Sequence, residues 1–232
     1  MVLEVATLKT SPLKDKAMKL LDERRSEIVQ TAMDLIRFPS ENPPGLERDI
    51  AQFLAEHLRE LGLEVRVIET ERRRLNVVAV LPGASNHPTL ILNGHTDVVP
   101  AGSRERWSHP PYEPVLEDGK LFGRGSTDMK GALSSMIHAV KALMDLDVKL
   151  RGRLVLQFVA DEEAGGSEGT GYLVRKGRVQ GDYAIVCEPT DQQIAIAEKG
   201  LIWVRIKVEG RAAHSSRPEE GVNAIVKMAG VI

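Results

Sequence analysis

Short apolar segments that favour β-strands alternate along this chain with longer segments of helical periodicity, and this alternation restricts the possible folds most strongly. The segments with strand-like composition are 63–70, 75–81, 89–94, 153–161 and 183–188, and two further strands are expected within 193–210. Helical segments between hydrophobic strands are typical of an α/β sandwich with a largely parallel sheet, and 232 residues suffice for a sizeable core.

Three segments carry apolar residues at helical spacing, namely 15–38, 46–62 and 129–146. Pro39 ends the first segment, and the PSENPPG sequence that includes it is expected to form a stiff loop. Gly62 stands where the C-terminal cap of the second helix belongs. His57 and His138 fall outside the apolar stripes of their helices, so we expect both imidazoles to contact water.

The balance of charge excludes some classes of function. The chain has 31 basic and 33 acidic residues, a net charge of -2, which gives no support to binding of nucleic acid or of a membrane surface. No apolar run approaches the ~20 residues that a membrane-spanning helix needs. The N-terminal residues do not have the pattern of a signal peptide, and Cys187 is the single cysteine, so we expect a cytoplasmic protein without an intramolecular disulfide.

The segment LILNGHTDVVPAG, residues 90–102, begins as a strand and then changes character. It breaks at Gly94 and presents His95 and Asp97, two residues apart. Residues i and i+2 of a strand lie on the same side, so these two side chains can contact each other or one shared ligand.

Three further acidic sites also follow strands or precede a helix. Asp128 stands just before a helix, Asp161–Glu163 closes one strand, and Glu188 closes another. Ligands of open α/β sheets bind outside the carboxyl ends of the strands. Each site alone is weak, because such residues are commonly helix caps or solvated surface groups. Together, converging carboxylates would repel one another, and one divalent cation or a pair of them would remove that conflict.

The motifs NGHTDVVP, GRGSTDMKG, ADEEAGG and CEPT, in this order, resemble those of the co-catalytic zinc hydrolases of the M20 peptidase family. That family includes acetylornithine deacetylase, succinyl-diaminopimelate desuccinylase, aminoacylase and glutamate carboxypeptidase. The resemblance extends from about Phe38 to the last residue, and GRAAHSSRPEEGVNAI is similar to part of the family's dimerisation, or lid, domain.

This resemblance implies a three-layer α/β sandwich with a mostly parallel mixed sheet, followed by the start of a ferredoxin-like α+β lid domain. The expected domains are 1–197, an N-terminal part of the catalytic domain, and 198–232, the beginning of the lid. The lid implies a homodimer.

The resemblance also implies a ligand set for two zinc ions, with cobalt as a possible substitute. His95 and Glu188 would bind one ion, Glu163 would bind the other, and Asp128 would bridge the two. Asp97 would orient His95 through its ring N–H. Glu162 would be the general base, and the lid residue His214 would reach the active site of the partner subunit and stabilise the oxyanion.

The implied reaction is hydrolysis of the amide bond of an N-acyl amino acid, as in the acetylornithine deacetylase and desuccinylase branch, which suggests a role in amino-acid biosynthesis. An M20 dipeptidase or carboxypeptidase uses nearly the same metal residues and stays an alternative. A non-catalytic chain that binds metal or dimerises is a second alternative.

The family's second zinc has one more ligand, a histidine near the C-terminus of a longer chain. The six histidines here are His57, His87, His95, His109, His138 and His214, and none stands in a matching motif. We therefore expect a fragment or a truncated chain that holds at most one zinc tightly and is inactive alone.

Overall fold

A computed structural model describes residues 11–197, 199–200, 202 and 204–231. The chain divides into two compact units, the first ending at Gln192 and the second beginning at Gln193. Each unit is described by itself. Whether the domains have the boundaries expected from the sequence stays a prediction.

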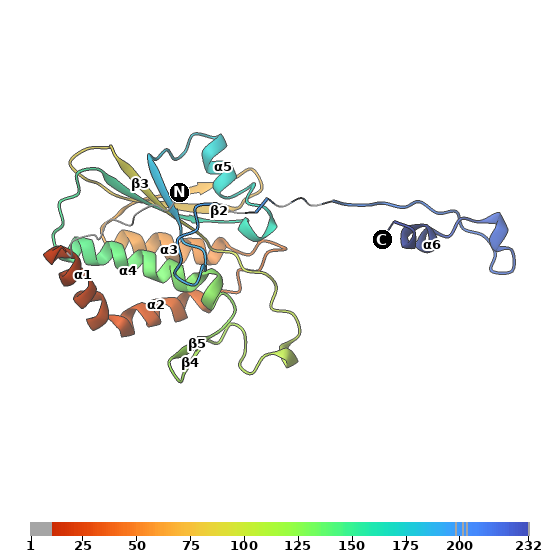
Figure 1. Ribbon diagram of the computed structural model, residues 1–232, viewed down its shortest axis with the longest axis horizontal. Coiled ribbons are helices and arrows are strands. Elements are labelled where there is room, and N and C mark those ends of the chain that lie inside the picture. The colour runs from red at the N-terminus through yellow and green to blue at the C-terminus, as the bar shows by residue number, and fades with distance from the viewer. Residues whose placement is uncertain (1–10, 198, 201, 203, 232) are drawn as a thin grey trace, which may run out of the picture. The chain divides into compact units, whose positions relative to one another are not determined.

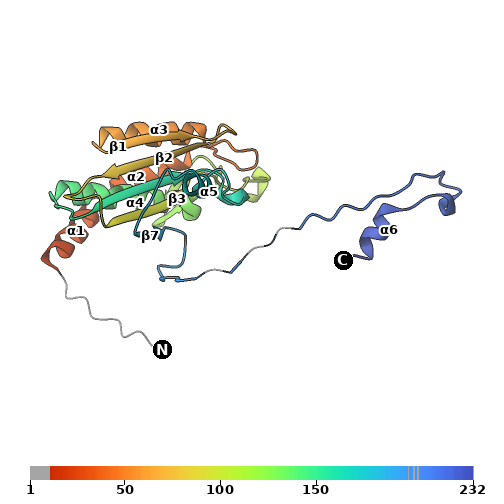
Figure 2. The same cartoon turned by 90° about the horizontal axis from the view of Figure 1, so that it is seen from above.

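The first unit contains a five-stranded sheet in the order β1-β2-β6-β3-β7. Its strands are β1 (Glu64–Glu69), β2 (Leu75–Leu81), β3 (Thr89–His95), β6 (Arg153–Val159) and β7 (Tyr183–Val186). β3 pairs in parallel with both β6 and β7, whereas β2 is antiparallel to its two neighbours. β1 and β7 form opposite edges of the sheet (Figure 2). The predicted mixed, mostly parallel α/β fold is therefore confirmed.

Helices cover both faces of this sheet. Helices α2 (Arg25–Ile36), α3 (Arg48–Glu60) and α4 (Gly131–Asp145) lie on one side, and α5 (Thr170–Arg175) lies on the other (Figure 1). Successive side chains of a strand point to opposite faces of the sheet, so alternate residues of the central strands pack against the helices on each side. Leu156 of β6 belongs to the core cluster under α2, α3 and α4, and its neighbour Val155 belongs to the cluster that contains Leu173 of α5.

The expected first helix is two helices. α1 (Pro12–Glu23) begins after Ser11, whose hydroxyl accepts a hydrogen bond from the backbone N–H of Leu13, and the chain leaves helical geometry at Arg24, where φ is −100°. α1 buries none of its residues, whereas α2 buries Leu35 and Ile36 against the core. Because of this break, α2 can pack against the core while α1 stays outside it.

The expectation that His138 contacts water is wrong. Only 4% of its surface is exposed, because α2 packs on α4 and covers this side of the helix. The imidazole Nε2 lies 3.0 Å from the hydroxyl of Thr31, a residue of α2. His57 is partly buried and stacks on the ring of Phe53, with 5.9 Å between the ring centroids.

Short elements interrupt the long connections. A helical turn, η1 (Arg104–Arg106), and a hairpin of β4 (Val115–Glu117) and β5 (Lys120–Phe122) lie in the connection between β3 and α4. An irregular turn, η2 (Ser126–Lys130), leads into α4, and η3 (Glu162–Ala164) follows β6. Both of these turns carry acidic residues singled out from the sequence.

The second unit contains η4 (Pro218–Glu220), α6 (Ala224–Ala229) and an antiparallel bridge between Arg211 and Val222. The two strands expected within 193–210 are not formed in the described part of that segment. Ile194 and Ile196, which alternate as in a strand, are 93% and 92% exposed. A strand needs a neighbouring strand for its backbone hydrogen bonds, and among the described residues no strand pairs with this segment. Among the described residues, no helix is long and apolar enough to cross a membrane.

Truncating the central core is expected to destabilise the first unit strongly. Phe158 is fully buried in β6, so Phe158→Ala removes a large apolar side chain and leaves a cavity that should cost about 3–5 kcal/mol. Leu116 in the β4–β5 hairpin is 51% exposed, so Leu116→Ala should cost less than about 1 kcal/mol. Urea unfolding followed by circular dichroism gives the free energy of unfolding of each variant. Equal losses of this free energy in the two variants would contradict the assignment of Phe158 to the core.

Candidate metal centre

The carboxyl ends of β3, β6 and β7 lie together at one edge of the sheet, because these three strands are parallel. His95 is the last residue of β3 and pairs with Val159, the last residue of β6, so the segments that follow both strands leave the sheet side by side. β7 runs parallel to β3 on its other side, with Val186 opposite Asn93. Asp97, Glu162, Glu163 and Glu188 therefore start from the same edge, as the sequence predicts for parallel strands.

A close packing contact adds the turn before α4 to this edge. A Cβ atom on Gly94 would lie 2.6 Å from Leu133 and 2.7 Å from Met129, so glycine lets the start of α4 approach β3. The backbone N–H of His95 also donates to the Met129 sulfur, at 3.1 Å. Asp128, one residue before Met129, is thereby held beside His95.

His95 is the centre of the cluster. The residue is 1% exposed, and its Nε2 lies 2.9 Å from the Asp128 carboxylate. The same nitrogen lies 3.6 Å from a carboxylate oxygen of Glu188 and 3.9 Å from one of Glu162. One edge of the imidazole thus faces three carboxylates that come from three different segments.

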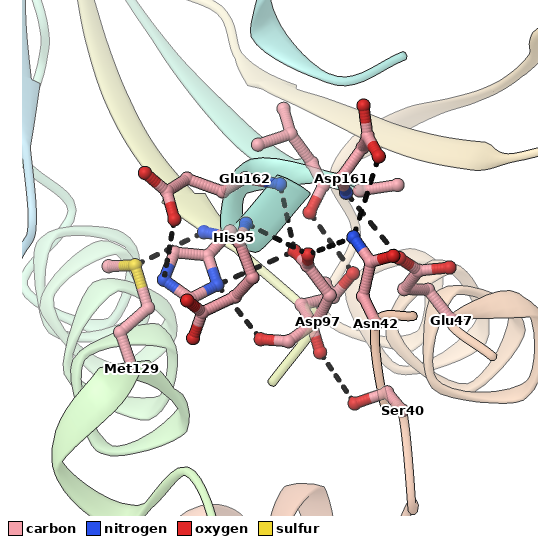
Figure 3. A network of polar contacts seen from close by, with 12 residues as sticks. Ser40, Asn42, Glu47, His95, Asp97, Met129, Asp161 and Glu162 are labelled. Carbon is pink, nitrogen blue, oxygen red and sulfur yellow. Dashed lines mark hydrogen bonds and ion pairs between the residues drawn. The ribbon is translucent and has the colours of Figure 1, made fainter. Parts of the chain in front are cut away.

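Asp97 lies beside the imidazole, at its Nδ1 nitrogen (Figure 3). Its backbone carbonyl oxygen is 2.9 Å from His95 Nδ1, while its carboxylate is 3.5 Å from the same nitrogen. The fully buried carboxylate instead accepts hydrogen bonds from the backbone N–H groups of Glu162 and Glu163, each at 3.1 Å. Asp97 therefore contacts both the histidine and the turn that carries the two glutamates.

Two sets of side chains can each place three ligand atoms within 4.8 Å of one another, His95 with Asp128 and Glu163, and His95 with Glu162 and Glu188. One imidazole nitrogen with several carboxylate oxygens is a donor set that suits a divalent cation such as zinc. Both sets share His95, and Glu162, expected to be the base, lies within ligand range. The residues present therefore fit at least one metal ion.

The electrostatics of the cluster also favour a cation. Burial disfavours a charged imidazole, but the nearby carboxylates of Asp128 and Asp97 outweigh it and raise the pKa of His95 to about 11. Burial and the nearby Asp128 carboxylate raise the pKa of Glu163 and that of Glu188. The cluster thus attracts positive charge at its centre, which a metal ion supplies when protons are released.

His214 belongs to the second unit. It is exposed, and its Nδ1 lies 2.9 Å from the hydroxyl of Ser216. Its contribution to an oxyanion site stays a prediction.

Two buried side chains near the cluster were not singled out from the sequence. Asn42 is 4% exposed and donates to the Asp97 carboxylate at 2.8 Å. Lys130 is fully buried, and its ammonium group donates to the carbonyl of Phe38 at 2.6 Å. Burial lowers the pKa of Lys130 to about 7, against the opposing effect of Asp97. The PSENPPG motif is the signal in the sequence that contains Asn42, and its prolines predict a stiff loop but not this contact.

Comparisons with known sequences give matches over most of the chain. A sequence model of the family described as "Peptidase family M20/M25/M40" matches residues 91–230. The chain is 33% identical over 227 residues to N-formyl-4-amino-5-aminomethyl-2-methylpyrimidine deformylase of Bacillus subtilis, covering 92% of this chain and 53% of that protein. It is 34% identical over 200 residues to a probable succinyl-diaminopimelate desuccinylase of Staphylococcus aureus, covering 86% of this chain and 49% of that protein.

Solved structures share the fold as well. Human carnosine dipeptidase 1 superposes with a TM-score of 0.64 at 28% identity, over 74% of this chain and 40% of that one. The M20 family metallo-carboxypeptidase Sso-CP2 of Sulfolobus solfataricus gives a TM-score of 0.62 at 25% identity, over 69% and 37% respectively. The chain spans about half the length of the curated relatives that it matches.

Proposed function

Because the chain belongs to peptidase family M20/M25/M40, we propose that it carries the metal site of a hydrolase that cleaves a linear amide bond, with an N-acyl amino acid as substrate. The observation that carries this proposal is the group of carboxylates around the buried His95. A fold that delivers one imidazole and four carboxylates to a single sheet edge is costly unless a cation offsets their repulsion.

The proposed ligands are those expected from the sequence. His95, Asp128 and Glu188 would hold one zinc ion, and Asp128 and Glu163 would hold a second ion where the site is complete. The contacts of His95 Nε2 with Asp128 and Glu188 support the first site. His95 is the one histidine in both candidate sets within the described residues, so we expect this chain to hold one ion tightly.

A bound divalent cation would lower the pKa of a coordinated water and polarise the substrate carbonyl. The residues of this chain supply the proton transfers. Glu162 accepts the proton of the attacking water and returns it to the departing amine. Asp97 holds the backbone of the Glu162–Glu163 turn and, through its carbonyl, the orientation of the His95 ring. His214 of a partner subunit would donate to the developing oxyanion, as the lid resemblance implies.

The relatives favour different substrates. The curated relatives named as a deformylase and a desuccinylase support removal of a small acyl group. A solved relative is named as a dipeptidase, which supports the alternative that the substrate is a short peptide. We favour the acyl amino acid, because the sequence identity of the chain to the desuccinylase, whose name gives an N-acyl amino acid, is 34%, whereas its identity to the dipeptidase is 28%.

The natural gene product that contains this chain should release amine from at least one member of a panel of N-formyl, N-acetyl and N-succinyl amino acids. A chelator should abolish the release, and added zinc or cobalt should restore it. Dipeptides are the comparison arm: cleavage of dipeptides alone would favour the peptidase alternative. If no panel member or dipeptide gives chelator-sensitive release, the proposed hydrolase function is wrong.

A further inference from the structure

The Asp97 carboxylate accepts three hydrogen bonds, and all three donors lie far away in sequence. One oxygen accepts from the backbone N–H of Glu162, and the other accepts from that of Glu163 and from the Asn42 side chain (Figure 3). All three donors are neutral. The carboxylate's direction is therefore fixed by the turn on one side and by Asn42 on the other.

Asn42 is itself held firmly. Its backbone N–H donates to the carbonyl of Val98 at 2.9 Å, and the N–H of Val98 donates to the carbonyl of Ser40 at 3.0 Å. The hydroxyl of Ser40 donates to the carbonyl of Thr96 at 2.6 Å. The segment 40–42 thus runs beside 96–98 and keeps the Asn42 amide in register with Asp97.

The Asn42 amide also reaches a second buried carboxylate. Its Nδ2 lies 3.4 Å from Asp161, whose surface is 6% exposed. An amide nitrogen carries two N–H donors, so one neutral side chain can serve two carboxylates that would otherwise repel each other. Asp161 has left-handed backbone geometry, with φ of 69°, and directly precedes the two glutamates.

A buried ion pair lies behind Asp161. The Arg74 guanidinium lies 3.4 Å from the Asp161 carboxylate and contacts both oxygens of Glu47, a residue that is 1% exposed. Glu47 in turn accepts the backbone N–H of Asp161 at 3.4 Å. A Cβ atom on Gly45 would lie 2.5 Å from the guanidinium, so the end of PSENPPG makes room for it.

We propose that Asn42 is a positioning residue of the metal centre: it holds the Asp97 carboxylate so that this group fixes the Glu162–Glu163 turn against His95. Asp161 and the pair of Arg74 and Glu47 support the same turn from behind. The expected effect on metal binding rests on the proposed function. The positioning of the Glu162–Glu163 turn by Asn42 does not, because it can be measured on the metal-free chain. It gives the PSENPPG motif a role beyond stiffness.

Two substitutions test this role. Asn42→Ala removes both donors and leaves Asp97 without one partner. Asn42→Asp keeps the shape but places a third carboxylate between Asp97 and Asp161, so its effect should be larger. Asn93→Ala is the matched control, because Asn93 is 9% exposed and its amide also reaches two acceptors, Gln157 at 2.8 Å and Thr170 at 3.1 Å.

The first readout is hydrogen exchange of the Glu162 and Glu163 amides, measured by NMR on the metal-free 232-residue chain. Asn42→Ala should speed this exchange roughly 10-fold, the change expected when one hydrogen bond is weakened. The second readout is cobalt affinity, which should fall ~10–100-fold, as for other residues that orient metal ligands. Asn93→Ala should change neither, although it should lower the overall stability.

Unchanged exchange in both Asn42 variants, or an equal change in Asn93→Ala, would overturn the proposal. A wild-type chain that binds no cobalt would overturn the metal centre, and the exchange measurement would still decide whether Asn42 positions the turn. The two failures are therefore distinguishable.

Discussion

Glu162→Gln is expected to reduce turnover by ~10²–10⁴-fold in the natural gene product while metal content stays near that of the wild type. Glutamine keeps the size of the side chain but cannot accept the proton of the attacking water. Glu163→Gln should instead lower metal content, because Glu163 belongs to the set that His95 and Asp128 complete. Glu113→Gln, a change to an exposed residue away from the cluster, is the control and should alter neither.

Elemental analysis and initial rates on the same preparations separate the two glutamates. The distinction matters because Glu162 also lies within ligand range of His95 and Glu188. Loss of metal in Glu162→Gln together with retained metal in Glu163→Gln would mean that the roles are exchanged.

His95→Ala is expected to weaken zinc binding by more than ~100-fold, since replacing residues that merely orient a ligand already costs ~10–100-fold. His95 supplies the one nitrogen donor in both candidate ligand sets of the described residues. His95→Gln keeps more of the side-chain volume and should show a similar loss, which guards against a folding defect in the alanine variant. Competition with a chromophoric chelator measures the affinity.

His87→Ala is the matched control for this loss. His87 is an exposed histidine that pairs with Asp182, away from the cluster. Its removal should leave zinc affinity unchanged. Equal zinc affinity in His95→Ala and the wild type would place the metal elsewhere.

The order of strands and helices could be predicted from the sequence, because residues buried on one face of a helix or strand recur at a characteristic spacing. Residues 153–159 form the central strand β6, which pairs with a strand on each side, as their mostly apolar sequence predicts. The segment 193–210 also contains apolar residues typical of strands but is not a strand in its described residues, because strand formation depends on a partner that composition does not reveal.

The members of the acidic cluster were likewise predictable, because they follow strands that end at one edge. Their finer arrangement was not. The sequence predicts that Asp97 orients His95 through its ring N–H, but it does not indicate that the Asp97 carbonyl lies nearest this nitrogen while the carboxylate binds the backbone of the Glu162–Glu163 turn. Such backbone contacts depend on how loops fold. The burial of His138 likewise depends on where α2 crosses α4, which helical periodicity within α4 cannot indicate.

The most direct test of the central claim is a cobalt titration of the metal-free 232-residue chain, followed by its visible absorption and by equilibrium dialysis. We expect one tightly bound ion per chain, with an absorption spectrum that disappears in His95→Ala. Absence of a tightly bound ion, or two such ions per chain, would contradict the account of a single site centred on His95.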